Sequence, residues 1–163
     1  MRVTLIHNAE AGNDERPAAD ELQELITAAG HDVFYQSCRD ENWTAALARP
    51  ADLVAIAGGD GTVGRVAKAL VGRHVPFTAL PLGTANNISR TLGLTDLSLE
   101  QLIAGWARGR RAKFDIGIAD GPWGLRYFIE GMGAGLFAWN MPQAHGSATL
   151  HHLHHADAKV AYA

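Results

Sequence analysis

The sequence contains one cysteine, Cys38, among its 163 residues, so the chain cannot form an internal disulfide. A lone cysteine is typical of a reducing compartment, and we expect a cytoplasmic protein. No apolar run approaches the roughly 20 residues that cross a bilayer as a helix. The apolar run within residues 1–7 is too short for a signal peptide, which favours the same expectation.

An excess of basic charge is also lacking. The chain carries 14 Lys and Arg residues against 17 Asp and Glu residues, a net charge of −3. Nucleic-acid-binding domains present an excess of basic side chains, so nucleic acid is not an expected partner. With 47% hydrophobic and 19% charged residues, the composition is typical of a soluble globular protein. The length allows one domain and a fragment of a second.

Strand-like and helix-like runs alternate along the first two thirds of the chain. This alternation predicts an α/β fold with a parallel sheet covered by helices on both faces, a three-layer Rossmann-like domain. Strands are expected at residues 2–8, 31–37, 52–57 and 77–80, and helices at residues 15–29, 43–48, 62–71, 88–93 and 99–107.

The pattern changes after Gly109. Residues 113–119 and 125–130 read as two strands joined by a turn, which predicts an antiparallel hairpin. We therefore expect a nucleotide-binding α/β domain at residues 1–109 and an incomplete β-rich segment at residues 110–163. Unpaired hairpin edges favour a homodimer.

The end of that segment, residues 144–163, is rich in Ala and His and is expected to be a helix. His151 and His155 would then lie one helical turn apart. A polar helix face is favoured over a metal site, because no cysteine or clear carboxylate partner accompanies these histidines.

A glycine turn follows the third expected strand. Gly58, Gly59 and Gly61 remove side chains where a ligand approaches the backbone, and the helix start that follows binds anions. Asp60 is unusual there, since a carboxylate repels phosphates unless a cation or hydrogen bonds compensate. The turn predicts a nucleotide phosphate site with Mg²⁺. The alternative is a plain strand-to-helix turn with Thr62 as the cap.

A second turn, residues 81–87, follows the fourth expected strand. Thr84 offers a hydroxyl, and Asn86 or Asn87 can cap the next helix. Ligands bind at the carboxyl ends of parallel strands, so both turns are expected to face one crevice. The alternative is a capped loop without a ligand.

The motif Gly-Gly-Asp-Gly-Thr (residues 58–62), followed by Pro-Leu-Gly-Thr-Ala-Asn-Asn (residues 81–87), resembles the diacylglycerol kinase catalytic domain family. This family includes bacterial lipid kinases and sphingosine kinases, and it shares the first motif with NAD kinases. The resemblance runs from about Val3 to Phe137. It implies an ATP-binding N-terminal domain, a β-rich C-terminal domain that completes the lipid site, and Mg²⁺-dependent transfer of the γ-phosphoryl group to a lipid hydroxyl.

The resemblance also implies a set of nucleotide-binding residues. The loop after the first strand keeps Asn8 and Gly12 of the family pattern, with Ala9 where proline is usual. Ser37 occupies the position of a threonine hydroxyl near ATP. For Asn8 and Ser37 the alternative is local turn chemistry. The implied nucleotide site comprises Asn8, Gly12, Ser37, Gly58, Gly59, Asp60, Gly61, Thr62, Thr84 and Asn86.

Two departures from the family pattern limit the expected activity. The family's catalytic base is an aspartate in an Asp-Gly-Glu-like sequence of the C-terminal domain. Here Asp120-Gly121 is followed by Pro122 and does not match, and Asp115 and Glu130 have no motif around them, so the catalytic residue is unknown. Residues 64–65 are Gly-Arg where the family has Asn-Glu, a charge reversal near the phosphates that either favours anion binding or removes a metal-linked contact.

We therefore expect weak nucleotide binding and little kinase activity from this chain alone, with the lipid acceptor met at the membrane surface. The alternatives are an NAD kinase-like enzyme and a non-catalytic nucleotide-binding module.

Overall fold

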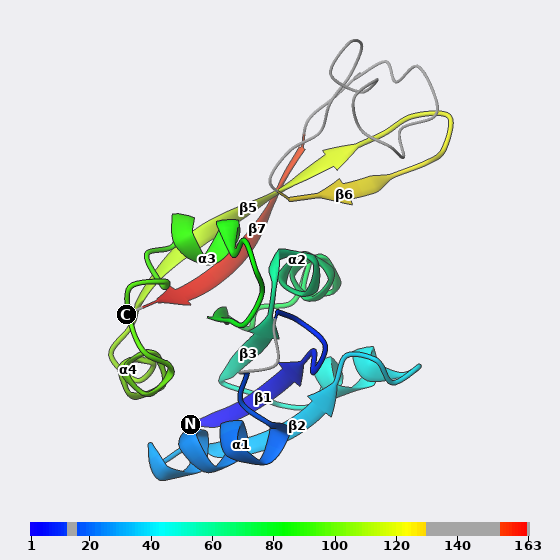
Figure 1. The fold of residues 1–163 in the computed structure, drawn as a ribbon. Coiled ribbons are helices and arrows are strands. Elements are labelled where there is room, and N and C mark those ends of the chain that lie inside the picture. Colours follow the sequence, from blue (N-terminus) through cyan, green and yellow to red (C-terminus); the bar gives the residue numbers. More distant parts are fainter. Residues whose placement is uncertain (13–15, 130–153, 163) are drawn as a thin grey trace.

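The computed structural model describes residues 1–12 and 16–129, and the backbone of residues 154–162 (Figure 1). These residues form a seven-stranded sheet in the order β2-β1-β3-β4-β7-β5-β6. The first four strands in the chain are parallel, as predicted. Their bounds are Arg2–His7 for β1, Asp32–Ser37 for β2, Leu53–Gly58 for β3 and Phe77–Pro81 for β4.

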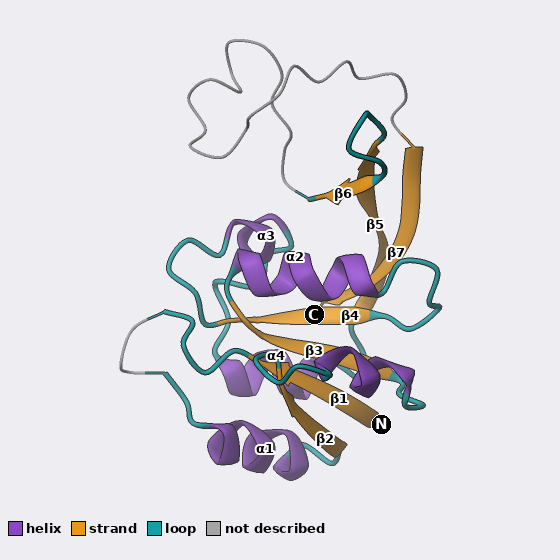
Figure 2. Ribbon diagram, turned by 90° about the vertical axis from the view of Figure 1, so that its right-hand side faces the viewer, coloured by secondary structure: helices purple, strands orange, loops and turns teal. Residues whose placement is uncertain are grey.

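Helices cover both faces of the parallel strands, which confirms the predicted three-layer α/β fold. Figure 2 shows α2 and α3 on one face of the sheet and α1 and α4 on the other. The helices are α1 (Ala19–Ala28), α2 (Asp60–Ala69), α3 (Asn87–Thr91) and α4 (Leu99–Gly105), with the 3₁₀ helix η1 at Trp43–Ala48.

The central strands form the core. Strand β3 is buried along its whole length, and β1 is buried from Val3 to His7. Strands that are covered on both faces read as continuous apolar runs rather than as alternating ones, and β3 has such a run. Strand β2, at the edge of the sheet, is only partly buried. The central position of β1, β3 and β4 places the loops that follow them on a rigid support.

Two helix starts differ by two or more residues from the sequence prediction. Helix α1 begins at Ala19 rather than at residue 15, after Pro17, because a residue that precedes a proline is disfavoured in the helical conformation. Helix α2 begins at Asp60 rather than at Thr62, so the glycine turn is tighter than predicted and Gly59 is the N-cap residue.

The last three strands are β5 (Arg110–Ala119), β6 (Arg126–Phe128) and β7 (His154–Tyr162). Strands β5 and β6 pair in an antiparallel hairpin, as predicted. The prediction of a helix at residues 144–163 was wrong for residues 154–162. This segment forms β7, which runs antiparallel to β5 from Ile118 to Arg110. A backbone ladder with a distant strand outweighs the weak helical preference of an Ala- and His-rich segment.

Strand β7 joins the hairpin to the parallel strands. It meets β4 at the single pair Phe77 and Val160 and pairs with β5 along its length. Strand β5 is therefore paired on both sides, by β7 and β6, which reduces the free edge on which the expectation of a homodimer was based. The homodimer and the division of the chain at Gly109 stay predictions. His155 lies in a strand and His151 lies outside the described residues, so helical spacing does not relate the two histidines.

Candidate nucleotide-binding site

Loops that follow β1, β3 and β4 meet at one edge of the sheet. Because these strands are parallel, their carboxyl ends lie together. The backbone amide of Asn8 donates a hydrogen bond to the Ala57 carbonyl at 2.9 Å, and the backbone amide of Leu82 donates one to the Gly58 carbonyl at 3.1 Å. Backbone hydrogen bonds thus fix the loops after β1 and β4 to the end of β3.

Close backbone contacts explain three of the glycines. A Cβ atom on Gly59 would lie 3.1 Å from the Gly83 Cα atom, and a Cβ atom on Gly83 would overlap the backbone of Gly59. Gly12, with a φ of +88°, leaves no room for a side chain beside the Leu82 carbonyl. The sequence folds this way because side chains are absent where the three loops touch.

Asp60 ties α2 to α3. One carboxylate oxygen accepts a hydrogen bond from the backbone amide of Asn87 at 2.9 Å, and the other accepts one from the backbone amide of Ile88 at 2.9 Å. The carboxylate thereby supplies partners for two amides of the first turn of α3, which have none within that helix. The sequence predicts that either a cation or hydrogen bonds compensate the Asp60 carboxylate, and this geometry supplies the hydrogen bonds.

Asn86 holds the turn after β4 closed. Its Oδ1 atom accepts a hydrogen bond from the backbone amide of Gly83 at 2.9 Å, and its Nδ2 atom donates one to the Gly83 carbonyl at 2.6 Å. Asn86 has a φ of +50°, a left-handed conformation that asparagine tolerates better than most residues. The residue therefore shapes the loop that carries Thr84.

Asn8 links the first loop to α2. Its Nδ2 atom donates to the buried Thr62 hydroxyl at 3.1 Å, and its Oδ1 atom accepts the Glu10 amide at 3.3 Å. Thr62 also sits against Gly58, where a Cβ atom would lie 2.8 Å from the threonine Cβ atom. The contact from Asn8 sets the distance between the end of β1 and the start of α2, and the missing side chain at Gly58 lets α2 approach the end of β3.

A cleft of about 470 Å³ lies where the three loops converge. The start of α2 borders the cleft. It presents backbone amides that have no partner inside the helix, and it is the positive end of the helix dipole. Of the predicted residues, Ser37, Gly58, Asp60 and Asn86 do not line it. The lining consists of Asn8, Ala11, Gly12, Gly59, Gly61, Thr62, Arg65, Gly83 and Thr84.

The predicted site did not include Ala11, Arg65 and Gly83. The sequence signal for Arg65 was the charge reversal expected near the phosphates, together with its position three residues after Thr62, which puts the two residues on one helix face. Ser37 makes a local contact instead: its hydroxyl accepts the Arg39 amide at 3.2 Å. This geometry is that of local turn chemistry, the alternative that was left open for Ser37.

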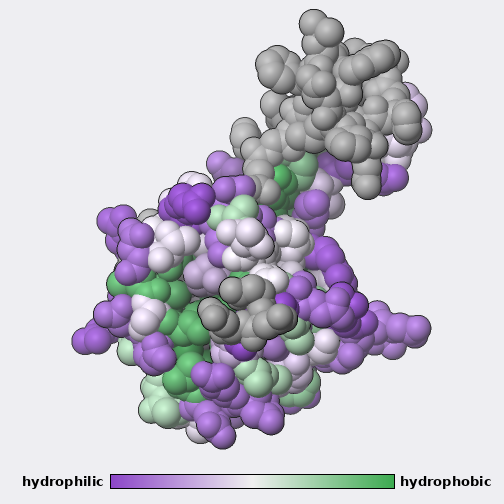
Figure 3. All heavy atoms as spheres, in the orientation of Figure 1, coloured by the Kyte–Doolittle hydropathy of each residue, from purple (hydrophilic) through white to green (hydrophobic). Residues whose placement is uncertain are grey.

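A second cavity of about 310 Å³ adjoins the cleft and is lined by Asn8, Cys38, Arg39 and Arg65. Arg39 forms an ion pair with Glu10. Burial raises the pKa of the Cys38 thiol, while the positive charges of Arg65 and Arg39 act to lower it. Figure 3 shows hydrophilic side chains gathered over the loop that follows β2, on the right of the view.

The chain is similar to a family model and to several known proteins. The family model of the diacylglycerol kinase catalytic domain matches residues 2–119. The chain belongs to the diacylglycerol kinase catalytic domain family. Diacylglycerol kinases from two Mycobacterium tuberculosis strains, CDC 1551 / Oshkosh and H37Rv, are each 40% identical to it over 74 residues, which is 45% of this chain and 22% of theirs.

Solved structures agree with this placement in the diacylglycerol kinase family. A diacylglycerol kinase structure from Bacillus anthracis str. Sterne is 25% identical, with a TM-score of 0.57, and the match covers 74% of this chain and 46% of that one. A structure of a putative diacylglycerol kinase from the same organism, 24% identical with a TM-score of 0.58, shows the same fold. The chain spans about a fifth of the length of the curated relatives and about half of the solved ones.

The described part of this diacylglycerol kinase family member offers no clear catalytic base. Asp115 is exposed on β5, Asp120 is exposed directly after β5, and neither lines the two cavities. Glu130 lies outside the described residues.

Within the described ranges there is no group of three or more His, Cys, Asp or Glu residues that could hold a metal ion. No described helix is both long enough and apolar enough to cross a bilayer.

His7, beside the site at the end of β1, makes folding stability sensitive to pH. Its side chain is 1% exposed, its Nε2 atom has no partner, and its ring contacts Tyr35 edge-on. Burial, and secondarily the charge of Arg16, lowers the His7 pKa from 6.5. The unfolded chain therefore binds a proton at a higher pH than the folded chain, and stability present above about pH 6.5 is lost as the pH falls.

We predict that the melting temperature of the wild type falls more between pH 8 and pH 5 than that of His7→Phe. Phenylalanine keeps a ring against Tyr35 but cannot take up a proton. Calorimetric melting of both proteins at the two pH values checks this. Equal pH dependence of the two proteins would contradict a buried, neutral His7.

Proposed function

We propose that this chain is the nucleotide-binding portion of an ATP-dependent lipid kinase. In the complete enzyme, a lipid hydroxyl oxygen attacks the γ-phosphorus of ATP, ADP leaves, and the hydroxyl proton passes to a base. The observation that carries the proposal is the convergence of the three glycine-containing loops on a cleft at the start of α2. The cleft volume, about 470 Å³, is in the range of small-molecule sites.

The lining fits a polyphosphate. Gly59 and Gly61 border the cleft at the start of α2, where anions are stabilised by free backbone N–H groups and by the helix dipole. The Thr84 hydroxyl and Arg65 add further donors. Phosphoryl transfer depends mainly on positioning and charge stabilisation, so fixed donors of this kind are the contribution expected of a nucleotide-binding portion.

The residues fit a magnesium ion that arrives with the nucleotide better than one held by the protein. The two carboxylates nearest the loops already have partners: Asp60 accepts two amides of α3, and Glu10 pairs with Arg39. Magnesium in phosphoryl-transfer sites is bound largely by substrate phosphates and water. When bound, the ion would neutralise charge on the transferring phosphoryl group.

The experiment combines calorimetry with an acceptor assay on the purified 163-residue chain. We expect ATP with Mg²⁺ to bind with a dissociation constant of about 0.1–1 mM, a value typical of weak nucleotide binding. We expect slow or undetectable phosphorylation of diacylglycerol in mixed micelles, because no described residue is a clear base. Undetectable ATP binding would contradict the proposal, and so would phosphorylation of NAD instead of lipid.

A further inference from the structure

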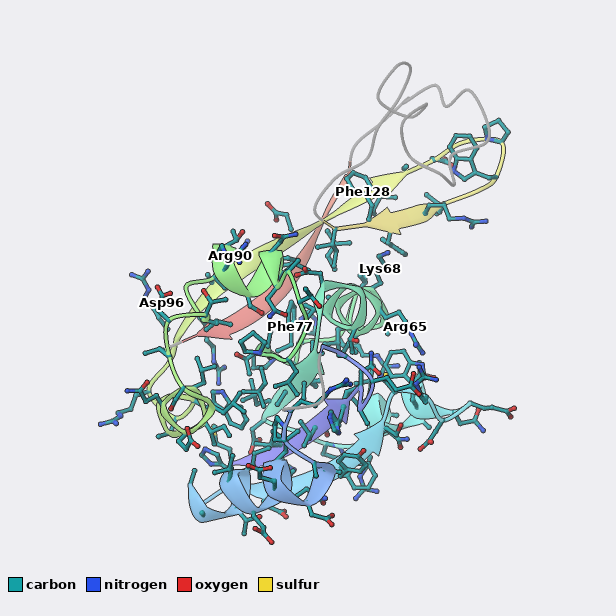
Figure 4. All side chains as sticks on the ribbon, viewed as in Figure 1. Arg65, Lys68, Phe77, Arg90, Asp96 and Phe128 are labelled. Carbon is teal, nitrogen blue, oxygen red and sulfur yellow. The ribbon has the colours of Figure 1, made fainter. Side chains whose placement is uncertain are left out.

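Arg65 lies in the common wall of two adjoining cavities. It lines the cleft of about 470 Å³ with Gly61 and Thr62, and it lines the cavity of about 310 Å³ with Cys38 and Arg39. Figure 4 shows Arg65 and Lys68 leaving α2 in different directions, with Arg65 on the side of η1. Arg65 is thus the cationic side chain that both cavities share within the described part of the chain.

The guanidinium of Arg65 is held by uncharged partners. Its Nη2 atom donates to the Cys38 carbonyl at 3.1 Å, and its Cζ atom lies 4.9 Å from the centre of the Trp43 ring. By contrast, Arg2 pairs with Asp52 and Arg39 pairs with Glu10. Among the residues described, no carboxylate lies within ion-pair distance of Arg65, so its positive charge stays uncompensated beside the cleft.

This arrangement fits a ligand-binding role better than a purely structural one. A guanidinium has five N–H donors, and the bond to Cys38 uses one of them. The contact with the Trp43 ring positions the guanidinium without neutralising its charge. An exposed, oriented and unpaired guanidinium next to a helix start is the geometry that phosphate recognition uses.

We propose that Arg65 is a phosphate-binding residue, and that the second cavity takes a phosphate group of the nucleotide whose other phosphates lie at the start of α2. The inference rests on the proposed nucleotide site and extends it to the cavity between α2 and the end of β2. Arg39 adds a second guanidinium to that cavity, partly offset by Glu10.

The test compares Arg65→Gln with Lys68→Gln, which removes the same charge from an exposed position on the same helix. Calorimetry measures the binding of inorganic triphosphate, ATP and adenosine to each protein. We expect Arg65→Gln to weaken triphosphate and ATP about 10-fold, the effect of one charge-assisted hydrogen bond, and to leave adenosine unchanged. Lys68→Gln is expected to change none of the three by more than about twofold.

The outcomes separate the two proposals. If the wild type binds ATP and Arg65→Gln binds it equally well, the role of Arg65 is wrong and the nucleotide site stands. If Arg65→Gln weakens adenosine as much as ATP, Arg65 acts on the nucleoside or on the fold, and the phosphate assignment is overturned. If the wild type binds neither ATP nor triphosphate, both proposals fail together.

Glu10→Gln provides a second variant that does not disturb the Arg65 contacts. Glu10 and Arg39 are both mostly exposed, at 62% and 59%, so losing their ion pair has little effect on folding. The change leaves the Arg39 guanidinium uncompensated at the second cavity. We expect triphosphate to bind about threefold more tightly, and unchanged or weaker triphosphate binding would overturn the phosphate subsite.

Discussion

Asp60→Asn is expected to weaken ATP binding about tenfold and to lower the free energy of unfolding by about 1–2 kcal/mol. The carboxylate accepts the amides of Asn87 and Ile88 with its two oxygens. An asparagine offers only one oxygen there, and its NH₂ group would face the other amide. The start of α3 would lose an anchor, and the loop that carries Thr84 would shift away from α2. Fluorescence titration with a labelled ATP analogue and urea unfolding measure the two effects.

The direction in which Asp60→Asn changes the affinity for ATP distinguishes an effect of charge from the anchoring of α3. By charge alone, removing a carboxylate beside a phosphate site should tighten ATP binding. Asp96→Asn, at an exposed position before α4 (Figure 4), makes the same change in charge and is the control. We expect it to alter affinity by less than about twofold, since exposed charges are largely screened. Tighter ATP binding by Asp60→Asn would contradict the anchoring role.

Gly83→Ala is expected to abolish measurable ATP binding and to destabilise the fold by about 1–3 kcal/mol. The added Cβ atom would overlap the backbone of Gly59 and lie 2.9 Å from the Asn86 Oδ1 atom. A backbone neighbour cannot rotate away as a side chain can, so the two loops must separate. The cleft that both loops line would then lose its shape.

Gly64→Ala is the matched control for Gly83→Ala. Gly64 lies inside α2, where a Cβ atom would meet nothing within 4 Å. The same substitution there is expected to stabilise the protein by about 0.5–1 kcal/mol, because alanine loses less backbone entropy in a helix than glycine does. Thermal melting and ATP titration of both variants check the pair. A Gly83→Ala protein that binds ATP as the wild type does would contradict the close contact of the loops.

The parallel part of the fold was predictable because its signals are local. Strand β3 is a continuous apolar run that ends in glycines. Helix α4 begins with a capping box between Ser98 and Gln101, two residues that are close together in the sequence. Strand β7 was not predictable, because its ladder with β5 joins residues far apart in the chain and its Ala- and His-rich segment carries no strand signal.

In the candidate site, too, some features could be predicted from local sequence and others depend on long-range contacts. The glycine turn and its position at the end of β3 follow from local sequence. The role of Asp60 depends on amides 27 and 28 residues further along, which no local pattern reveals. The place of Arg65 depends on Cys38, directly after β2, and on Trp43, at the start of η1, and both come from a segment of the chain well before α2. Long-range contacts therefore decide which of the motif residues face the cleft.

We propose that the loops after β1, β3 and β4 bind one polyphosphate together. Amide NMR spectra recorded while ATP and then inorganic triphosphate are added test this, because the amides of each loop give separate signals. We predict the largest shifts at the amides of Gly12, Gly59, Gly61, Thr62 and Thr84 with both ligands. Shifts confined to one loop, or centred on another face of the sheet, would contradict a shared site.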